Sequence, residues 1–291
     1  MKKVGIVAKT HSPLASEGLR ALTAWLDERG ISHMIDEESA RVAGVKSGVK
    51  KIDLARQADL IVVMGGDGTF LGVARLMEGN DAPILGVNLG GLGFLTEFAY
   101  EEMIPALERA LAGDFMSEDR AMLDAVVSRE GKNVTSYTVL NDVALNRGAF
   151  ARMPHMLVYV DGIFVNEYVA DGLLVATPTG STAYNLSVGG PIMHPSLGAM
   201  IISPICPHTL SNRPIVIPDG HTVEIALAPS IQTEAVATMD GQVGFQMSFR
   251  DRLLIKKSAS VTRIILSPHK NYYQLLRGKL KWGEAIRYGK E

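Results

Sequence analysis

The chain has 291 residues, of which 47% are hydrophobic and 21% charged, a balance typical of a globular protein with one large or two ordinary domains. Lys and Arg total 29 against 31 Asp and Glu, so the formal charge of −2 indicates neither nucleic acid nor a membrane as partner. A single cysteine, a short apolar N-terminus and the lack of an apolar run of about eighteen residues predict a cytoplasmic protein.

The first part of the chain alternates buried apolar runs with amphipathic segments. Residues 4–8 predict a strand, and a helix follows from Ser12, a candidate N-cap, to Gly30, a helix stop. Residues 31–35 predict a second strand, whereas residues 41–51 are weakly patterned and allow no assignment. Strands that alternate with helices favour a parallel α/β domain.

A glycine-rich turn follows the apolar strand predicted over residues 60–64, and a helix is predicted over residues 69–78. Glycine lets an anion approach backbone N–H groups, and a helix start favours phosphate. The candidate phosphate loop therefore consists of Gly65, Gly66, Gly68 and Thr69. A carboxylate here, Asp67, would repel phosphate unless it holds a metal or accepts a proton from an attacking hydroxyl. The alternative is that Asp67 only caps the helix.

Neither the P-loop spacing nor the Rossmann glycine spacing fits this loop. Further along, residues 83–88 predict another buried strand, which ends in a second glycine-rich turn at residues 89–94. If the strands are parallel, both turns lie at the same edge of the sheet. A helix predicted over residues 101–111 ends at Gly113.

After Arg120 the pattern changes to short strands, which predict an all-β domain of two packed antiparallel sheets. Asp161-Gly162 and Asp240-Gly241 predict hairpin turns. The predicted strands cover residues 122–128, 135–140, 156–160, 163–169, 225–227, 234–239, 243–249, 253–256 and 261–266. Residues 271–288 are basic and weakly helical.

Within this domain a hydroxyl-rich segment, residues 177–184, follows Asp171-Gly172 and a short apolar run. Short polar side chains and exposed backbone can hydrogen-bond an adenine and its ribose, and Tyr184 offers a ring for stacking. The alternative is an ordinary loop with a Ser/Thr-capped turn.

Together these motifs resemble those of the NAD kinase family. The loop at residues 65–69 is also similar to that of diacylglycerol-type lipid kinases and, more distantly, phosphofructokinases, whereas residues 171–191 match NAD kinases alone. Asn141-Asp142 and residues 90–95 match as well, so the resemblance runs from about Val4 to Ser267.

The resemblance implies an N-terminal parallel α/β domain, residues 1–118 with about 270–291, followed by a C-terminal β-sandwich-like domain, residues 119–269. The last helix returns to the N-terminal domain, and NAD lies across the cleft between the domains. The implied activity is transfer of the terminal phosphoryl group of ATP to the 2′-hydroxyl of the adenosine ribose of NAD, giving NADP.

By the same resemblance, Asp67 is the catalytic acid/base, and Mg²⁺ or another divalent cation accompanies ATP. The family's substrate contacts fall on Asp67, Gly68, Phe94, Asn141, Asp142, Arg152, Asp171, Thr182, Ala183, Tyr184, Asn185, Leu186, Ser187 and Gln242. Some come from a neighbouring subunit, so a homodimer or homotetramer is expected. One departure is Val169, where some members carry arginine.

Two other functions stay open. A lipid kinase would share the loop at residues 65–69 but would need an apolar groove and no hydroxyl-rich segment. A non-enzymatic dinucleotide sensor would bind NADP without making it and would tolerate loss of the Asp67 carboxylate. The sequence leaves open whether ATP or polyphosphate is the donor, and whether NAD or NADH is the acceptor.

Overall fold

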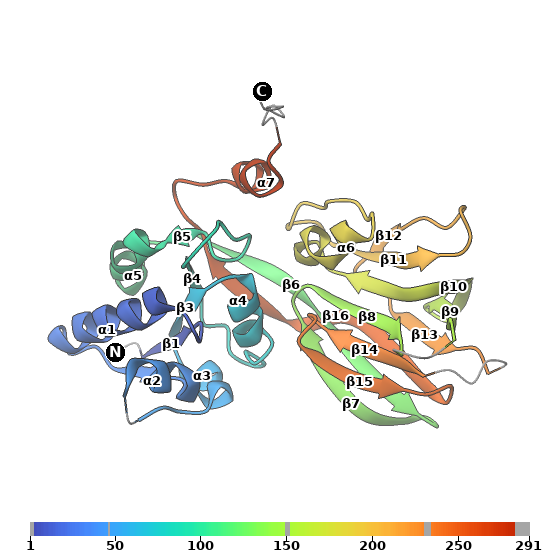
Figure 1. Cartoon of the computed structure of the whole chain (residues 1–291), viewed down its shortest axis with the longest axis horizontal. Helices are drawn as coiled ribbons and strands as arrows, with labels where there is room; N and C mark the ends of the chain where they lie inside the picture. Colours follow the sequence, from blue (N-terminus) through green and yellow to red (C-terminus); the bar gives the residue numbers. More distant parts are fainter. Residues whose placement is uncertain (1–2, 46, 149–151, 230–233, 283–291) are drawn as a thin grey trace, which may run out of the picture. The chain divides into compact units, whose positions relative to one another are not determined.

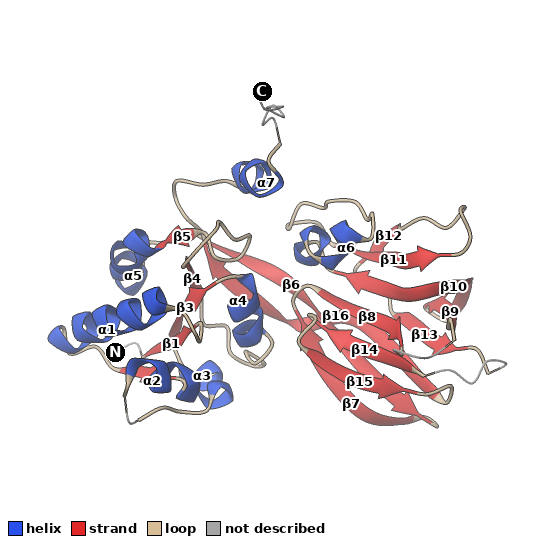
Figure 2. Cartoon of the chain, in the orientation of Figure 1, coloured by secondary structure: helices blue, strands red, loops and turns tan. Residues whose placement is uncertain are grey.

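The computed structural model describes residues 3–45, 47–148, 152–229 and 234–282 (Figure 1). The chain divides into two units: an α/β unit, residues 1–119 with 263–291, and a β unit, residues 120–262. Helices and strands alternate in the first, and strands make up most of the second (Figure 2). Within the described ranges, no helix is long and apolar enough to cross a membrane.

The α/β unit is built on a parallel sheet, as predicted, and its strand order is β4-β3-β1-β2. At the carboxyl edge, Ala8 pairs with Met64 and Gly65 pairs with Asn88, so the segments that follow these strands are neighbours. The strands are β1 (Val4–Ala8), β2 (His33–Ile35), β3 (Leu60–Gly65), β4 (Ile84–Asn88) and the short β5 (Phe98–Ala99).

Helices cover both faces of this sheet (Figure 1). Leucines of α1 and α5 share one core with the inward side chains of β1, β3 and β4. On the other face, β1 approaches α3 so closely that a Cβ added to Gly5 would lie 2.6 Å from Leu54 Cδ2. The helices are α1 (Pro13–Glu28), α2 (Glu37–Ala43), α3 (Lys51–Gln57), α4 (Asp67–Ala74), the 3₁₀ turn η1 (Tyr100–Glu102) and α5 (Met103–Ala112).

Several helix predictions are confirmed and one needs correction. The α1 helix begins as predicted, with the Ser12 hydroxyl accepting the Ala15 N–H at 3.3 Å. In the weakly patterned residues 41–51, for which the sequence made no assignment, α2 ends and α3 begins, each only seven residues long. Their shortness explains the weak periodicity. The motif helix also starts at Asp67 and ends at Ala74, earlier than predicted.

In the β unit the strands pair antiparallel, and a long strand can pair with different neighbours along its length. Along its first half β10 pairs with β9, and along its second half it pairs with β8 and β11. Both predicted Asp-Gly hairpins are confirmed, between β9 and β10 and between β14 and β15. The strands are β6 (Ser117–Arg129), β7 (Lys132–Val139), β8 (Asp142–Arg147), β9 (His155–Val160), β10 (Ile163–Ala176), β11 (Ala199–Pro207), β12 (Ile215–Pro218), β13 (Val223–Leu227), β14 (Ala235–Met239), β15 (Val243–Met247) and β16 (Asp251–Ile265).

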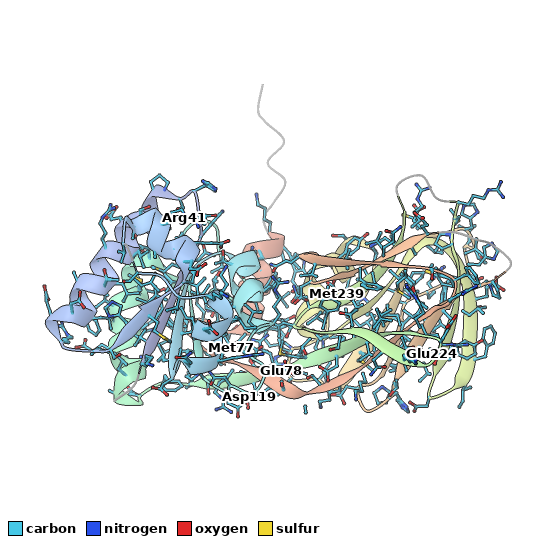
Figure 3. The ribbon with its side chains drawn as sticks, turned by 90° about the horizontal axis from the view of Figure 1, so that it is seen from below. Arg41, Met77, Glu78, Asp119, Glu224 and Met239 are labelled. Carbon is cyan, nitrogen blue, oxygen red and sulfur yellow. The ribbon has the colours of Figure 1, made fainter. Side chains whose placement is uncertain are left out.

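One apolar core fills the β unit, with inward residues from β6, β8, β9, β10, β13, β14 and β16. Met239, at the end of β14, belongs to it and is 2% exposed (Figure 3). The sequence did not predict β8, β11 and β12. Two prolines in β11, Pro204 and Pro207, hide it, because proline argues against a strand.

The last helix, α7 (Tyr272–Leu280), belongs to the α/β unit, which confirms the predicted return of the chain. Ahead of α7, the Lys270 ammonium lies 3.2 Å from the Glu102 carboxylate. A Cβ added to Gly278 would lie 3.2 Å from Leu92 Cδ2, in the second glycine-rich turn. The predicted continuation to Tyr288 lies outside the described residues beyond 282.

Candidate active site

The predicted phosphate loop connects β3 to α4. Gly65 is a glycine because of close packing, since a Cβ there would lie 2.5 Å from Thr69 Oγ1. Gly66 is the N-cap of α4, and no atom lies within 4 Å of a Cβ added to Gly66 or Gly68. The loop therefore leaves space beside the first N–H groups of a helix, where an anion is stabilised.

The Asp67 carboxylate is held by the second glycine-rich turn. Oδ2 accepts the Phe94 N–H at 3.0 Å, and Oδ1 accepts the Leu95 N–H at 3.0 Å. No side chain caps α4, so the alternative in which Asp67 only caps its own helix is wrong. The two parallel strand ends thus hold a carboxylate in one orientation inside a loop suited to phosphate.

The third donor to Asp67 is the Thr96 hydroxyl, which is oriented by Asn88. The Gly90 N–H donates to Asn88 Oδ1 at 2.7 Å, which points the Asn88 amide nitrogen toward Thr96 Oγ1 at 2.9 Å. Because an amide nitrogen only donates, the Thr96 hydroxyl must direct its own proton elsewhere, and Asp67 Oδ1 lies 3.4 Å away. Oδ1 therefore has two donors, and Oδ2 has the Phe94 N–H.

Phe94 lies next to Asp67, as its backbone contact requires, and its ring is half-buried. The Lys279 ammonium of α7 lies 5.9 Å from the ring centroid, within range of a cation–π contact. Beside the same turn is a hollow of about 250 Å³, whose walls include Asn88, Gly90 and Leu92. The last helix thus helps to shape the surroundings of the second glycine-rich turn.

In the β unit, Asn141 and Asp142 form the turn between β7 and β8. They are 8% and 5% exposed. Asn141 Oδ1 is buried and has no hydrogen-bond partner among the residues that the structure describes. Buried polar atoms are nearly always paired, so this oxygen marks a place where a ligand donor would be stabilised.

The hydroxyl-rich segment packs directly against that turn. Thr177 donates its N–H to the Asn141 carbonyl at 2.9 Å and its hydroxyl to the Leu140 carbonyl at 2.6 Å. A Cβ on Gly180 would overlap the Asn141 backbone, so only glycine fits. The two predicted motifs, far apart in sequence, are therefore one structure.

The segment continues as a 3₁₀ turn, η2 (Thr179–Thr182), and a short helix, α6 (Tyr184–Ser187). Tyr184 is 40% exposed, and Ser187 is exposed as well. Three other residues of the segment are half-buried, Thr182, Ala183 and Leu186.

Asn185 differs from its neighbours because it is fully buried. Its amide nitrogen donates to the Ser181 and Pro191 carbonyls, at 3.2 and 3.0 Å, and its oxygen accepts the Ser203 hydroxyl at 2.7 Å. The Asn185 side chain thus fixes the path of the segment.

Charge is unevenly balanced around the Asn141–Asp142 turn. Burial, with the nearby Asp240 carboxylate second, raises the pKa of Asp142 to about 7. Burial also raises the pKa of Tyr184, helped by Cys206, Asp142 and Asp171. Asp171 is in turn paired with Arg147 at 3.1 Å. A carboxyl group that titrates near neutral pH can donate as well as accept a hydrogen bond.

The remaining predicted residues are more exposed. Arg152 and Gln242 are both exposed, and Gln242 lies in the turn between β14 and β15, with its N–H on the Met239 carbonyl at 2.9 Å. Val169 pairs with His155 in the β9–β10 ladder. Sequence reasoning missed Asp240 as part of the site, because its Asp-Gly pair indicated only a hairpin.

Two family models match the chain. The ATP-NAD kinase N-terminal domain matches residues 4–115, and the ATP-NAD kinase C-terminal domain matches residues 140–267. Among curated relatives, the NAD kinase of Geobacter sulfurreducens is 46% identical over 284 residues, covering 98% of this chain and 100% of its own. That of Magnetococcus marinus is 44% identical over 290 residues, covering 98% of this chain and 95% of its own.

Solved structures give the same result. Yeast NADH kinase complexed with NADH matches with a TM-score of 0.90 and 25% identity, over 100% of this chain and 90% of that one. An NAD kinase from Archaeoglobus fulgidus in complex with ATP matches with a TM-score of 0.75 and 25% identity, over 95% of this chain and 99% of that one. With both family models matched in order and relatives similar over nearly its full length, the chain belongs to the NAD kinase family.

Proposed function

We propose that this chain transfers the terminal phosphoryl group of ATP to the 2′-hydroxyl of the adenosine ribose of NAD, giving NADP. The observation that carries this proposal is the Asp67 carboxylate, fixed by the Phe94 and Leu95 N–H groups within a phosphate-binding loop. A carboxylate in an anion site is unfavourable unless it handles a proton or a cation. Proton transfer from a hydroxyl to Asp67 gives it that role.

A ribose hydroxyl is a far weaker acid than a carboxylic acid, so Asp67 does not remove its proton in advance. In a loose transition state the attacking oxygen loses its proton late, and the base orients the hydroxyl and then receives that proton. Oδ2 is the better placed oxygen, since Oδ1 already accepts from Leu95 and Thr96. The N–H groups at the start of α4 stabilise the charge on the phosphates.

The divalent cation expected with ATP fits this loop as a companion of the nucleotide. Among the described residues, no three His, Cys, Asp or Glu side chains form a group that could hold a metal. Mg²⁺ is commonly bound through one or two carboxylates together with substrate phosphates, and Asp67 supplies one carboxylate beside the loop. When bound, the cation neutralises charge on the donor oxygens.

Recognition of the adenosine is assigned to the β unit. Asn141 Oδ1 can only accept, so its ligand partner is a donor, such as the adenine amino group or a ribose hydroxyl. Asp142 can donate or accept near neutral pH, and the exposed Tyr184 ring can stack on a base. An apolar lipid would leave Asn141 and Asp142 unpaired, which argues against the lipid kinase.

The deciding experiment incubates the purified chain and Mg²⁺ with each donor, ATP or polyphosphate, and each acceptor, NAD, NADH or diacylglycerol. NADP or NADPH formation, measured with a dehydrogenase-coupled assay, is the expected result. Phosphorylated lipid would establish the lipid kinase. Binding of NADP with no turnover from any donor would establish the sensor.

A homodimer or homotetramer remains part of the proposal, because the family resemblance implies substrate contacts from a neighbouring subunit. Sedimentation velocity at micromolar concentration, with and without NADP, tests it. A monomer that is fully active at assay concentration would contradict it.

A further inference from the structure

One carboxylate in the β unit accepts hydrogen bonds from three successive backbone N–H groups. Asp240 Oδ1 accepts from Asn141 at 2.7 Å and from Asp142 at 3.1 Å, and Oδ2 accepts from Leu140 at 3.1 Å. The Asp240 N–H in turn donates to the Asp142 carbonyl at 2.9 Å. Every bond joins residues about a hundred positions apart in sequence, so this is a tertiary clamp.

We propose that Asp240 is a positioning residue for dinucleotide recognition, and that it acts by fixing the backbone of the Asn141–Asp142 turn. The inference rests on the proposed function, because it takes that turn to contact NAD. Hydrogen bonds to a charged acceptor are stronger than neutral ones, so a carboxylate holds three amides better than a neutral side chain could. The same hairpin bears Gln242, so one carboxylate ties two predicted contact regions together.

A matched turn in the same unit provides a control. Asp161, in the other Asp-Gly hairpin, has φ of 49°, and Asp240 has φ of 50°. The Asp161 carboxylate accepts the Thr222 N–H at 2.8 Å and contacts His221 at 2.5 Å. Asp161 thus holds an exposed segment distant in sequence through one backbone bond and an ion pair, whereas Asp240 holds three successive amides of a buried turn that bears predicted substrate residues.

The second consequence is electrostatic. Asp240 is the charged group that adds to burial in raising the pKa of Asp142, and Tyr184 also lies within reach of the Asp142 charge. Neutralising Asp240 should therefore lower the pKa of Asp142, although burial keeps it above the ordinary value. If the turn did not contact NAD, the KM for NAD would not follow the titration of Asp142, so the pH profile of this KM separates a role in recognition from a purely structural one.

The experiment compares Asp240→Asn with the matched control Asp161→Asn in the full chain. Asparagine keeps the shape and one acceptor oxygen but places an N–H₂ group against a backbone N–H. We expect the KM for NAD to rise at least about 10-fold in Asp240→Asn, while the KM for ATP changes less than about twofold. We also expect the midpoint of the pH dependence of the KM for NAD to move to lower pH. Asp161→Asn should leave both quantities at the wild-type values.

Formation of NADP by the wild-type chain tests the proposed function first. The KM for NAD of each variant, divided by the wild-type value, then tests the positioning role of Asp240. Equal effects of the two variants on the KM for NAD, or an unchanged pH profile in Asp240→Asn, would overturn it. If Asp240→Asn does not fold, hydrogen–deuterium exchange on the wild type decides: the amides of residues 140–142 should exchange slowly, and rapid exchange there would overturn the inference.

Discussion

The role of Asp67 can be tested by replacing its carboxylate with an amide, Asp67→Asn. Asparagine has nearly the same shape, but it cannot receive a proton from the ribose hydroxyl. General base catalysis typically contributes about 10²–10⁴-fold, or roughly 3–5 kcal/mol of the barrier. We therefore expect kcat to fall at least about 100-fold, with the affinity for NAD little changed.

The structure also indicates how much Asp67→Asn lowers the free energy of unfolding. The asparagine oxygen can still accept one of the two N–H groups, from Phe94 or Leu95, but its N–H₂ group faces the other. One unsatisfied amide costs about 1–3 kcal/mol, so the variant should unfold at lower urea concentration yet stay folded under assay conditions. Circular dichroism and a binding titration with NAD establish this before kcat is measured.

A control on the same strand separates loss of chemistry from loss of a hydrogen bond. Asp59, just before β3, accepts the Lys3 N–H at 2.7 Å, so Asp59→Asn makes the same chemical change at the far end of the strand. It should keep a near wild-type kcat. A kcat for Asp67→Asn within about tenfold of wild type, in a folded protein, would remove Asp67 from the role of base.

Three further outcomes can be measured. Thr96→Val removes the hydroxyl that donates to Asp67, so kcat should fall about 5–10-fold with an unchanged KM for NAD, and Thr96→Ser should restore it; equal rates in both variants would contradict the relay. The folded-state pKa of Asp142, about 7, lies above its ordinary 3.8, so the native state binds more protons and stability falls as pH rises from about 4 to 7. In urea unfolding, Asp142→Asn should match wild type near pH 4 and exceed it near pH 8 by up to about 4 kcal/mol; equal stability at both pH values would contradict this. Leu19→Ala, in the fully buried face of α1, should cost about 2–5 kcal/mol without changing kcat.

Local chemistry explains which parts of this molecule could be predicted from sequence. The β3–loop–α4 unit is encoded within ten residues by a β-branched run and three glycines, so both the loop and its aspartate could be located. Both Asp-Gly hairpins were equally local. Short elements failed where the signal was weak, as in the seven-residue α2 and α3 and the proline-bearing β11.

What the sequence could not give is the set of partners that long-range folding brings to each motif. The amides that hold Asp67 come from 27 and 28 residues away, and those that Asp240 holds come from 98 to 100 residues away. No pattern within a strand or turn encodes such pairs. The burial of Asn185 was hidden for the same reason, since its side chain on α6 bonds to Ser203 on β11.

The two site carboxyl groups show how one fold prepares opposite hydrogen-bonding roles. Asp67 accepts from two backbone amides and the Thr96 hydroxyl, an arrangement that suits an ionised acceptor. Asp142 is buried near the negative Asp240, an arrangement that favours the protonated donor. Burial of the Asp142 carboxyl group beside a second negative charge destabilises the fold, and Asp142→Asn should be the more stable protein above neutral pH. The three backbone amides that Asp240 holds account for Asp240, whereas the cost of burying the Asp142 carboxyl group is best explained by a ligand that needs it.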